Sequence, residues 1–152
     1  MLRHVQEGLH DALEELRDLA RGIYPPLLSD QGLVAALEAQ ARKSPVPVRV
    51  EAAGLDRYPP ETEAAIYFCA LEALQNMAKY AGAREALVRL GWEGGSLRFE
   101  VADDGRGFDP AATGPGTGVQ GMIDRVSALG GTLRVVSAPG TGTRIVGQIP
   151  LA

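Results

Sequence analysis

Polar side chains recur at helical spacing within an otherwise apolar segment of this chain. Glu72, Asn76 and then Lys79 or Tyr80 stand at positions i, i+4 and i+7 or i+8, which lie on one face of a helix. A carboxylate and an amide oxygen stacked one turn apart can bind a hard cation, directly or through water. A lysine one turn further could approach phosphate oxygens. Taken alone, the pattern is more typical of a solvated helix face with ordinary ion pairs.

A second candidate follows a segment with the alternation of a strand. Asp103 stands at the end of that segment, and Gly105 and Gly107 come two and four residues later. Glycines at this spacing let the backbone fold around a flat ligand. A buried carboxylate there can accept a hydrogen bond from an exocyclic amine such as that of adenine. Asp-Gly is by itself also an ordinary turn signal.

The third candidate is the glycine-rich segment 114–122. Gly116 to Gly121 match G-x-G-x-x-G, but a dinucleotide site needs a strand directly before this motif and an acid about twenty residues after it. A Gly/Pro loop precedes the match and no acid stands near Thr141, which excludes a Rossmann site. The chain has no G-x-x-x-x-G-K-[ST] either, which excludes a P-loop. A glycine loop that enters a helix remains, and the first N–H groups of such a helix suit phosphate.

The last candidate is Gly140-Thr141-Gly142-Thr143. Small residues allow close backbone approach and Thr143 offers a hydroxyl, while a tight hairpin accounts for the same residues equally well.

These segments must be positioned by a mixture of helices and strands. Hydrophobic periodicity and turn residues predict helices at 33–43, 61–81 and 119–129, and strands at 46–50, 85–92, 96–102, 132–137 and 143–149. Pro47 favours an edge position for the first strand, and Gly94-Gly95 predicts a hairpin. We therefore expect an α/β two-layer sandwich whose mixed, mostly antiparallel sheet is covered by helices on one face.

Residues 1–30 carry a different pattern. Apolar residues recur at alternating three- and four-residue steps, as in a coiled coil or helix bundle: Leu2, Val5, Leu9, Ala12, Leu16, Leu19 and Ile23. One helix cannot bury such a seam against itself, so partner helices from another chain or from further sequence are expected. Packing on its own domain is the alternative. Tyr24-Pro25-Pro26 ends the helix.

Composition excludes several functional classes. The net charge of −4 argues against a large basic footprint for nucleic acid. The single cysteine, Cys69, lies in an apolar run and is expected to be a small buried hydrophobe, because it can form neither an internal disulfide nor a metal-ligand cluster with other cysteines. No apolar stretch reaches the ~18 residues of a membrane span, so a cytoplasmic location is expected, with a membrane anchor in a longer parent protein left open.

The order of the four motifs is more specific than any one of them. An E-x-x-x-N helix, a strand ending in D-x-G-x-G, a G-x-G-x-x-G lid and a terminal G-T-G-T strand together resemble the N, G1 and G2 boxes and the closing strand of the GHKL ATPase superfamily. That superfamily includes gyrase, mismatch-repair ATPases, heat-shock chaperones and histidine kinases. The resemblance covers about residues 33–150. It implies the Bergerat fold, in which ATP lies between the long helix and a flexible lid.

The sequence ahead of the ATPase region narrows the resemblance. Residues 16–33, L-R-D-L-A-R-G-I-Y-P-P-L-L-S-D-Q-G-L, resemble the end of the dimerisation helix and the linker in sensor histidine kinases of the nitrate-sensor class. G-M-I-D-R-V at 121–126, followed by L-G-G, is similarly typical. The resemblance implies that 1–30 is the second helix of a dimerisation region with its linker, and that 31–152 is the ATP-binding catalytic domain. One departure is Tyr80, where the family commonly has histidine.

The resemblance also implies roles for single residues. Asp103 would accept the adenine amine, with Gly105 and Gly107 giving the base room, and Asn76 would bind Mg²⁺ between the phosphates. Glu72 would polarise the attacking group or a metal-bound water. The implied catalytic residues are Glu72, Asn76 and Lys79, and the implied ATP-binding residues are Asp103, Gly105, Gly107, Gly116, Thr117, Gly118, Gly121, Met122 and Thr143. The implied partners are the dimerisation bundle of a homodimeric parent kinase and a response regulator.

Leu9-His10-Asp11 resembles the sequence around the phosphoacceptor histidine of this family. In the family a turn and a whole second helix separate the acceptor from the P-P-x-L linker, whereas fourteen residues in one uninterrupted heptad pattern separate His10 from Pro25. We therefore expect His10 to be an ordinary surface residue, and the chain to be a fragment that does not phosphorylate itself. His4 is a weaker candidate still.

Two other functions share parts of this pattern. An anti-sigma-type serine kinase belongs to the same superfamily, but the heptad helix and the P-P-L-L linker argue against it. A nucleotide-binding or dimerisation module without turnover is the second, and the intact glycines and Asn76 argue against such degeneration without excluding it.

Overall fold

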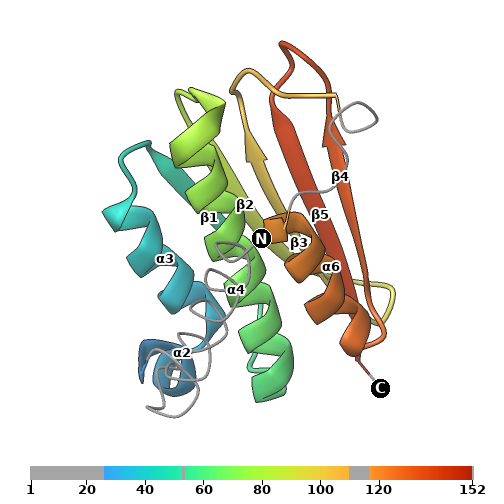
Figure 1. Cartoon of the computed structure of the whole chain (residues 1–152). Coiled ribbons are helices and arrows are strands. Elements are labelled where there is room, and N and C mark those ends of the chain that lie inside the picture. Colours follow the sequence, from blue (N-terminus) through green and yellow to red (C-terminus); the bar gives the residue numbers. More distant parts are fainter. Residues whose placement is uncertain (1–25, 53, 110–116, 152) are drawn as a thin grey trace, which may run out of the picture.

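The computed structural model describes residues 26–52, 54–109 and 117–151, and the heptad segment therefore lies outside the described residues. Within them, five strands form one sheet in the order β1-β2-β3-β5-β4 (Figure 1). The strands are β1 (Val48–Ala52), β2 (Ala86–Glu93), β3 (Ser96–Asp103), β4 (Thr132–Ser137) and β5 (Thr143–Pro150). β1 pairs with β2 in parallel, and the remaining pairs are antiparallel.

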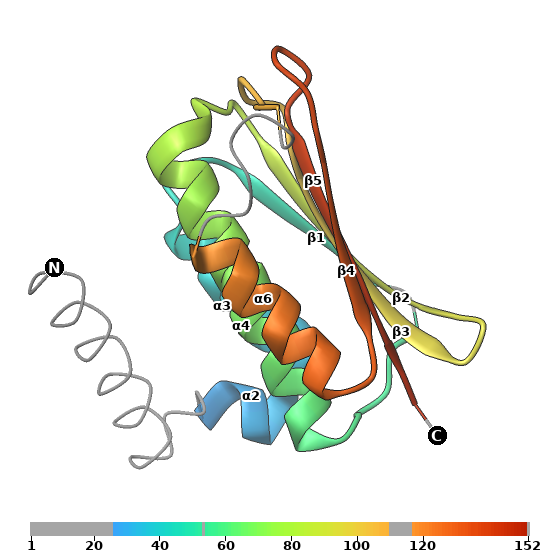
Figure 2. The same cartoon turned by 45° about the vertical axis from the view of Figure 1, so that its right-hand side comes forward.

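The helices lie on one face of this sheet, as Figure 2 shows most plainly. They are α2 (Pro26–Gln31), α3 (Leu33–Lys43), α4 (Pro60–Asn76), the π-helical turn η1 (Met77–Ala81) and α6 (Thr117–Ala128). The expected two-layer sandwich with a mixed sheet is confirmed.

Several boundaries differ from the predictions for physical reasons. The first strand begins two residues later than predicted, because Pro47 contributes only its carbonyl, which accepts the N–H of Ala86. The predicted helix at 61–81 is α-helical only to Asn76 and continues as a π-helix, a hydrogen-bond shift that apolar periodicity does not encode. Gly82 then ends it with a positive φ of 61°.

The core lies between α4 and the central strands. Ile66 and Cys69 of α4 are fully buried, as are Leu97 and Phe99 of β3. Gly147 of β5 has no Cβ to obstruct the Phe99 ring, so the ring packs directly over the neighbouring strand. Cys69 is the buried residue that was expected, and burial raises the pKa of its thiol to about 12.

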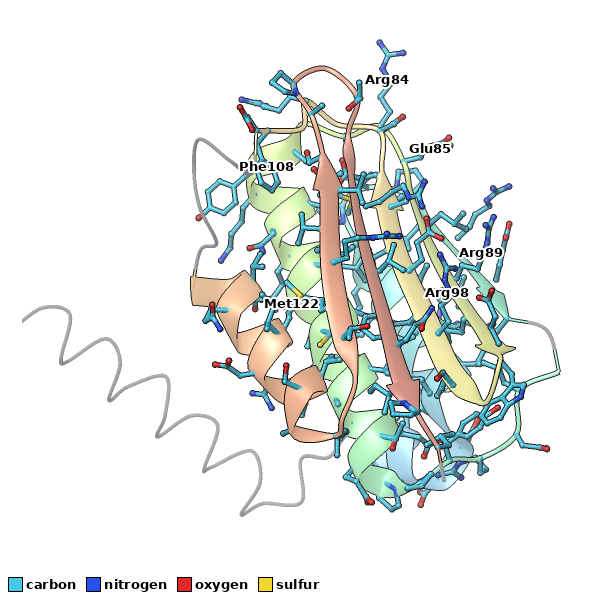
Figure 3. All side chains as sticks on the ribbon, turned by 90° about the vertical axis from the view of Figure 1, so that its right-hand side faces the viewer. Arg84, Glu85, Arg89, Arg98, Phe108 and Met122 are labelled. Carbon is cyan, nitrogen blue, oxygen red and sulfur yellow. The ribbon has the colours of Figure 1, made fainter. Side chains whose placement is uncertain are left out.

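The opposite face of the sheet carries charges instead of a second layer. Arg89 and Arg98 lie on the side away from the helices, whereas Met122 lies on the helix side (Figure 3). The Glu100 carboxylate pairs with two arginines: Oε1 lies 2.8 Å from Arg144 Nε, and Oε2 lies 3.5 Å from Arg98 Nη1. Arg89 Nε lies 3.3 Å from Glu51 Oε2. Strands β1, β2, β3 and β5 thus contribute to ion pairs on the face away from the helices.

Near the turn of the β2–β3 hairpin, Trp92 of β2 stacks on Tyr58, which precedes α4 in the sequence. The rings of Tyr58 and Trp92 stack with centroids 6.3 Å apart, and Trp92 is half exposed. Among the described residues, no helix is long and apolar enough to cross a membrane.

Candidate nucleotide-binding site

A cleft of about 890 Å³ opens between the end of α4, the start of α6 and one end of the sheet. Its volume is typical of a small-molecule site. Apolar side chains from the strands and both helices line it: Ala73, Met77, Val101, Val119, Ile123, Leu133, Val135 and Ile145. Polar groups stand around this lining, so the cleft offers an apolar slot for a flat ligand with a polar rim.

The helix wall of the cleft carries the first predicted cluster. Glu72 and Asn76 line it from α4, and both alternatives that the spacing left open, Lys79 and Tyr80, line it from η1. An ammonium group and two side-chain oxygen donors thus share one wall. Tyr80 is 69% exposed and stands at the rim.

The first turn of α6 packs directly on Glu72. A Cβ placed on Gly118 would overlap a carboxylate oxygen of Glu72, so any other residue there would displace the end of the Glu72 side chain. The free N–H groups of a helix N-terminus favour a nearby anion, whether a carboxylate or a phosphate. Glu72 and the start of α6 therefore form one edge of the cleft.

Asp103 lies at the sheet end of the cleft and is half-buried. Its Oδ1 accepts the N–H of Gly105 at 2.8 Å. Burial raises the pKa of the Asp103 carboxyl, while the backbone N–H groups of Gly105 and Thr143 act in the opposite direction. With its side chain held from the backbone, the carboxylate is set to accept a hydrogen bond from a ligand amine.

The exposed neighbour Asp104 accepts hydrogen bonds from backbone N–H groups instead of facing the cleft. Its Oδ1 accepts the N–H groups of Arg84 at 2.8 Å and Glu85 at 3.1 Å, and these bonds lower the pKa of its carboxyl. Two adjacent acids therefore have opposite pKa shifts, and Asp103 alone of the two lines the cleft.

The glycines after Asp103 allow close contacts between backbone segments. A Cβ on Gly105 would overlap the carbonyl of Ala81, whose oxygen also accepts the N–H of Arg106 at 2.8 Å. A Cβ on Gly107 would overlap the carbonyl of Ala138. The loop thus packs tightly against η1 and the β4–β5 turn, and of the two glycines only Gly107 reaches the cleft.

Thr143 takes part in a hydroxyl network below the cleft. Its Oγ1 lies 2.9 Å from the Oγ of Ser137, which also accepts the N–H of Phe108 at 2.9 Å. Ser137 in turn donates to the carbonyl of Gly142. This network ties the G-T-G-T segment to the loop that follows Asp103.

Seven of the predicted residues line the cleft together: Glu72, Asn76, Lys79, Asp103, Gly107, Gly118 and Thr143. Gly105 and Met122 are buried, and Gly121 is half-buried and not part of the cleft lining. The Sγ of Cys69 donates to the Met122 carbonyl at 3.8 Å, so Met122 belongs to the packing beneath α6. Gly116 lies outside the described residues, as does the side chain of Thr117.

Sequence reasoning missed the apolar lining and the rim residues Arg106 and Phe108. Strand alternation held the signal for the lining, because Val101 and Asp103 stand two residues apart on one face, as do Thr143 and Ile145.

A preformed metal cage is absent from the described part of the chain, where no group of three or more His, Cys, Asp or Glu side chains comes together. Glu72 and Asn76 offer a carboxylate and an amide oxygen on the same wall. Such a sparse donor set fits Mg²⁺, which is usually held by one or two protein oxygens together with substrate phosphates and water.

The sheet is covered by helices on one face, and the cleft lies between the long helix α4 and the start of α6, which follows a glycine-rich segment. This arrangement defines a nucleotide-binding α/β domain of the GHKL type. The chain belongs to the Histidine kinase-, DNA gyrase B-, and HSP90-like ATPase family, which matches residues 61–152. Membership of this family implies that the domain binds ATP.

Individual relatives are signalling kinases. The chain is 33% identical over 153 residues to the sensor histidine kinase MctS of Rhizobium johnstonii, covering 95% of this chain and 33% of that protein. It is 29% identical to the signal transduction histidine-protein kinase/phosphatase DegS of Brevibacillus brevis, covering 95% and 43%. The chain thus spans less than half the length of these curated relatives.

Solved structures agree with the fold. The Erythrobacter litoralis EL346 blue-light activated histidine kinase is similar with a TM-score of 0.64 and 30% identity, covering 78% of this chain and 42% of that one. The Acinetobacter baumannii histidine kinase AdeS has the same TM-score at 16% identity, a likeness of fold alone, covering 95% and 79%.

Proposed function

We propose that this chain is the ATP-binding catalytic domain of a sensor histidine kinase of the nitrate-sensor class. It binds Mg-ATP and presents the γ-phosphoryl to a histidine on a dimerisation helix of the parent protein. The observation that carries the proposal is the half-buried Asp103 at one end of an apolar cleft whose helix wall holds Glu72, Asn76 and Lys79. The linker sequence at 16–33 supports the nitrate-sensor class.

The adenine end of the site is assigned to the sheet. Asp103 accepts the exocyclic amine, and apolar residues such as Val101 and Ile145 contact the faces of the base. An apolar slot with one fixed acceptor favours a purine that carries an amine, because a ligand without a donor there removes water from the half-buried carboxylate and replaces none of its hydrogen bonds.

The phosphate end is assigned to the helices. Lys79 and the N-terminus of α6 attract the phosphates, and Asn76 is the residue that would hold Mg²⁺. When bound, the ion neutralises charge on the β- and γ-phosphates. Glu72 orients the attacking nitrogen or a water, from its position beside Gly118 in the first turn of α6.

The remaining chemistry concerns partners. The acceptor histidine lies on the first helix of the dimerisation bundle, which is contributed by the parent homodimer, and an aspartate of a response regulator receives the phosphoryl next. With these partners and ATP as its ligand, the domain is proposed to act in the cytoplasm. His10 is not the acceptor in this proposal. Incubation with labelled ATP tests this point, since acid-labile label on His10 would overturn it.

The decisive experiment compares two adjacent acids by titration calorimetry with Mg-ATP. In Asp103→Asn, Oδ1 still accepts the Gly105 N–H, and the second oxygen is replaced by an NH2 group that donates instead of accepting. We therefore expect ATP affinity to fall about tenfold or more. Asp104→Asn is the matched control, because its Oδ1 can still accept the Arg84 and Glu85 N–H groups, and its affinity should stay unchanged.

Equal binding of ATP by the wild type and Asp103→Asn would contradict the assignment of Asp103. Binding that does not depend on Mg²⁺ would contradict the role of Asn76. Binding of Mg-ATP by a parent kinase that never labels a histidine would instead favour a nucleotide-binding module without turnover.

A further inference from the structure

The first turn of α4 holds a buried carboxylate that the nucleotide site does not use. The Glu63 side chain is 2% exposed, and Arg57 approaches both of its oxygens, with Nε 3.2 Å from Oε2 and Nη2 3.1 Å from Oε1. Such a two-point contact fixes the plane of the guanidinium as well as its distance. Glu63 therefore determines where the other N–H groups of Arg57 point.

Those N–H groups point at the end of α2. Arg57 donates to the carbonyls of Leu28 at 3.3 Å and Ser29 at 3.0 Å through Nη2, and to that of Asp30 at 3.4 Å through Nη1. The last carbonyls of a helix have no partner within it, and a guanidinium can satisfy several of them at once. One arginine thus joins the last turn of α2 to the first turn of α4.

The residue after α2 is adapted to this contact. Gly32 has a φ of 94°, and a Cβ there would stand 3.0 Å from the Arg57 Cδ. Leu28 fills the core beneath with no exposed surface. We call Arg57, Glu63 and the carbonyls of Leu28, Ser29 and Asp30 the α2 clamp. Figure 2 shows α2 against the end of α4 that lies away from the β4–β5 turn.

Helix α4 connects the clamp to the nucleotide site. Glu63 and Glu72 stand on the same uninterrupted helix, about 14 Å apart along its axis at 1.5 Å per residue. The polypeptide that precedes Pro26 enters the domain through α2. A change in how α2 sits on α4 therefore moves the point at which residues 1–25 join the domain.

We propose that Arg57 and Glu63 are positioning residues that hold α2, and with it the preceding dimerisation helix, at the orientation required for phosphoryl transfer from ATP bound along α4. This inference rests on the proposed function. Misplacement of reacting groups by about 1 Å can cost on the order of a hundredfold in rate, so a loosened clamp slows transfer without changing the ATP site itself.

The first test measures the docking of α2 in the 152-residue chain. Exposed Gln31 on α2 and Gln75 on α4 are replaced by cysteine and spin-labelled. Cys69 does not compete for label, because it is fully buried and burial raises its thiol pKa to about 12. We expect a narrow distance distribution for this double-cysteine protein and a broad one once Arg57→Gln is added.

The matched control for this test is Arg49→Gln. Arg49 is an exposed arginine on the charged face of the sheet, 3.5 Å from Glu51, and its loss should leave the label distances unchanged. A distribution that stays narrow in Arg57→Gln overturns the clamp.

The second test measures autophosphorylation in the full-length kinase. Arg57→Gln should lower kcat by about tenfold or more while the KM for ATP changes less than about twofold. Arg57→Lys keeps the charge without the two-pronged geometry and should recover only part of the rate.

A double variant separates positioning from stability. Arg57→Gln combined with Glu63→Gln leaves no unpaired buried charge, so it should regain the Tm lost in Arg57→Gln but not the kcat. Recovery of kcat together with Tm, or an unchanged kcat in Arg57→Gln, overturns the positioning role. If the unaltered kinase neither binds ATP nor labels a histidine, the proposed function fails, and the label distances alone decide whether Arg57 docks α2.

Discussion

The two ends of helix α4 treat their carboxylates in opposite ways. At the first turn, Glu63 is buried and paired with Arg57. Near the last turn, Glu72 lines an open cleft and contacts the start of α6. At the first turn of α4, the carboxylate stabilises the fold through its ion pair. Near the last turn, the carboxylate faces the cleft and can contact a ligand.

The backbone repeats this contrast. The clamp end begins with Pro60 in an ordinary first helical turn, while the cleft end leaves α-helical geometry at Met77 and packs against a loop through Gly105. Helix α4 thus changes its hydrogen-bond pattern at the cleft end and stays a regular α-helix at the clamp end. Substitutions at the two ends should therefore separate stability from binding.

The largest effect is expected at the clamp. Arg57→Ala leaves Glu63 buried without its charged partner, and the free energy of unfolding should fall by about 3 kcal/mol. Urea denaturation measures this, with Arg49→Ala as the control. Mg-ATP affinity of the folded protein should stay the same, and a large loss of affinity would show that the two ends are not independent.

A smaller loss is expected where the backbone is tightest at the cleft end. Gly105→Ala places a Cβ on the Ala81 carbonyl, and the free energy of unfolding should fall by about 2 kcal/mol. Here, unlike at the clamp, ATP affinity should fall as well, because η1 and the loop that carries Arg106 move apart. Wild-type affinity in this variant would contradict the contact.

A gain in stability is expected in α6. A Cβ on Gly121 meets nothing within 4 Å, so Gly121→Ala should raise the free energy of unfolding by about 0.5–1 kcal/mol through helix propensity. Calorimetric ATP titration of the same variant decides whether Gly121 belongs to the binding site. Unchanged affinity would remove it from the proposed ATP-binding residues.

The smallest effects are pH slopes from the two adjacent acids. The raised pKa of Asp103 means that the folded state holds this proton more tightly, so its contribution favours the fold below the ordinary aspartate pKa and is lost as pH rises through the folded value. The lowered pKa of Asp104 acts oppositely: its contribution is present above the ordinary pKa and is lost as pH falls through the folded value.

Unfolding curves across acidic pH check these signs. Asp103→Asn should steepen the rise of stability with pH relative to the wild type, and Asp104→Asn should flatten it. The same slope change in both variants would contradict the opposite environments.

Much of the cleft was predictable because its polar residues form ordered motifs on periodic elements. Glu72 and Asn76 follow from helical spacing, and Asp103 from its place at a strand end. The clamp was not predictable in the same way. Two prolines separate Arg57 from Glu63 in the sequence, so the pair does not lie on one helix. Arg57 also donates hydrogen bonds to carbonyls 27 to 29 residues earlier, and such contacts depend on tertiary packing alone.

Two further features escaped prediction for local reasons. Helix α2 has six residues and begins directly after Pro25, so it shows no apolar period. The π-helical turn η1 contains residues that suit an α-helix equally well, and its last residue, Ala81, packs against Gly105 of a loop distant in the sequence.

The stacked Tyr58–Trp92 pair gives the protein a built-in optical probe. Trp92 is the single tryptophan of the 152-residue sequence. In the sheet it stands opposite Leu97 of β3, which lies about 20 Å along that strand from Asp103 at roughly 3.3 Å per residue. Its fluorescence should therefore report unfolding while remaining silent when ATP enters the cleft. A shift of the fluorescence-detected midpoint with ATP concentration would then read binding through mass action, without any added dye.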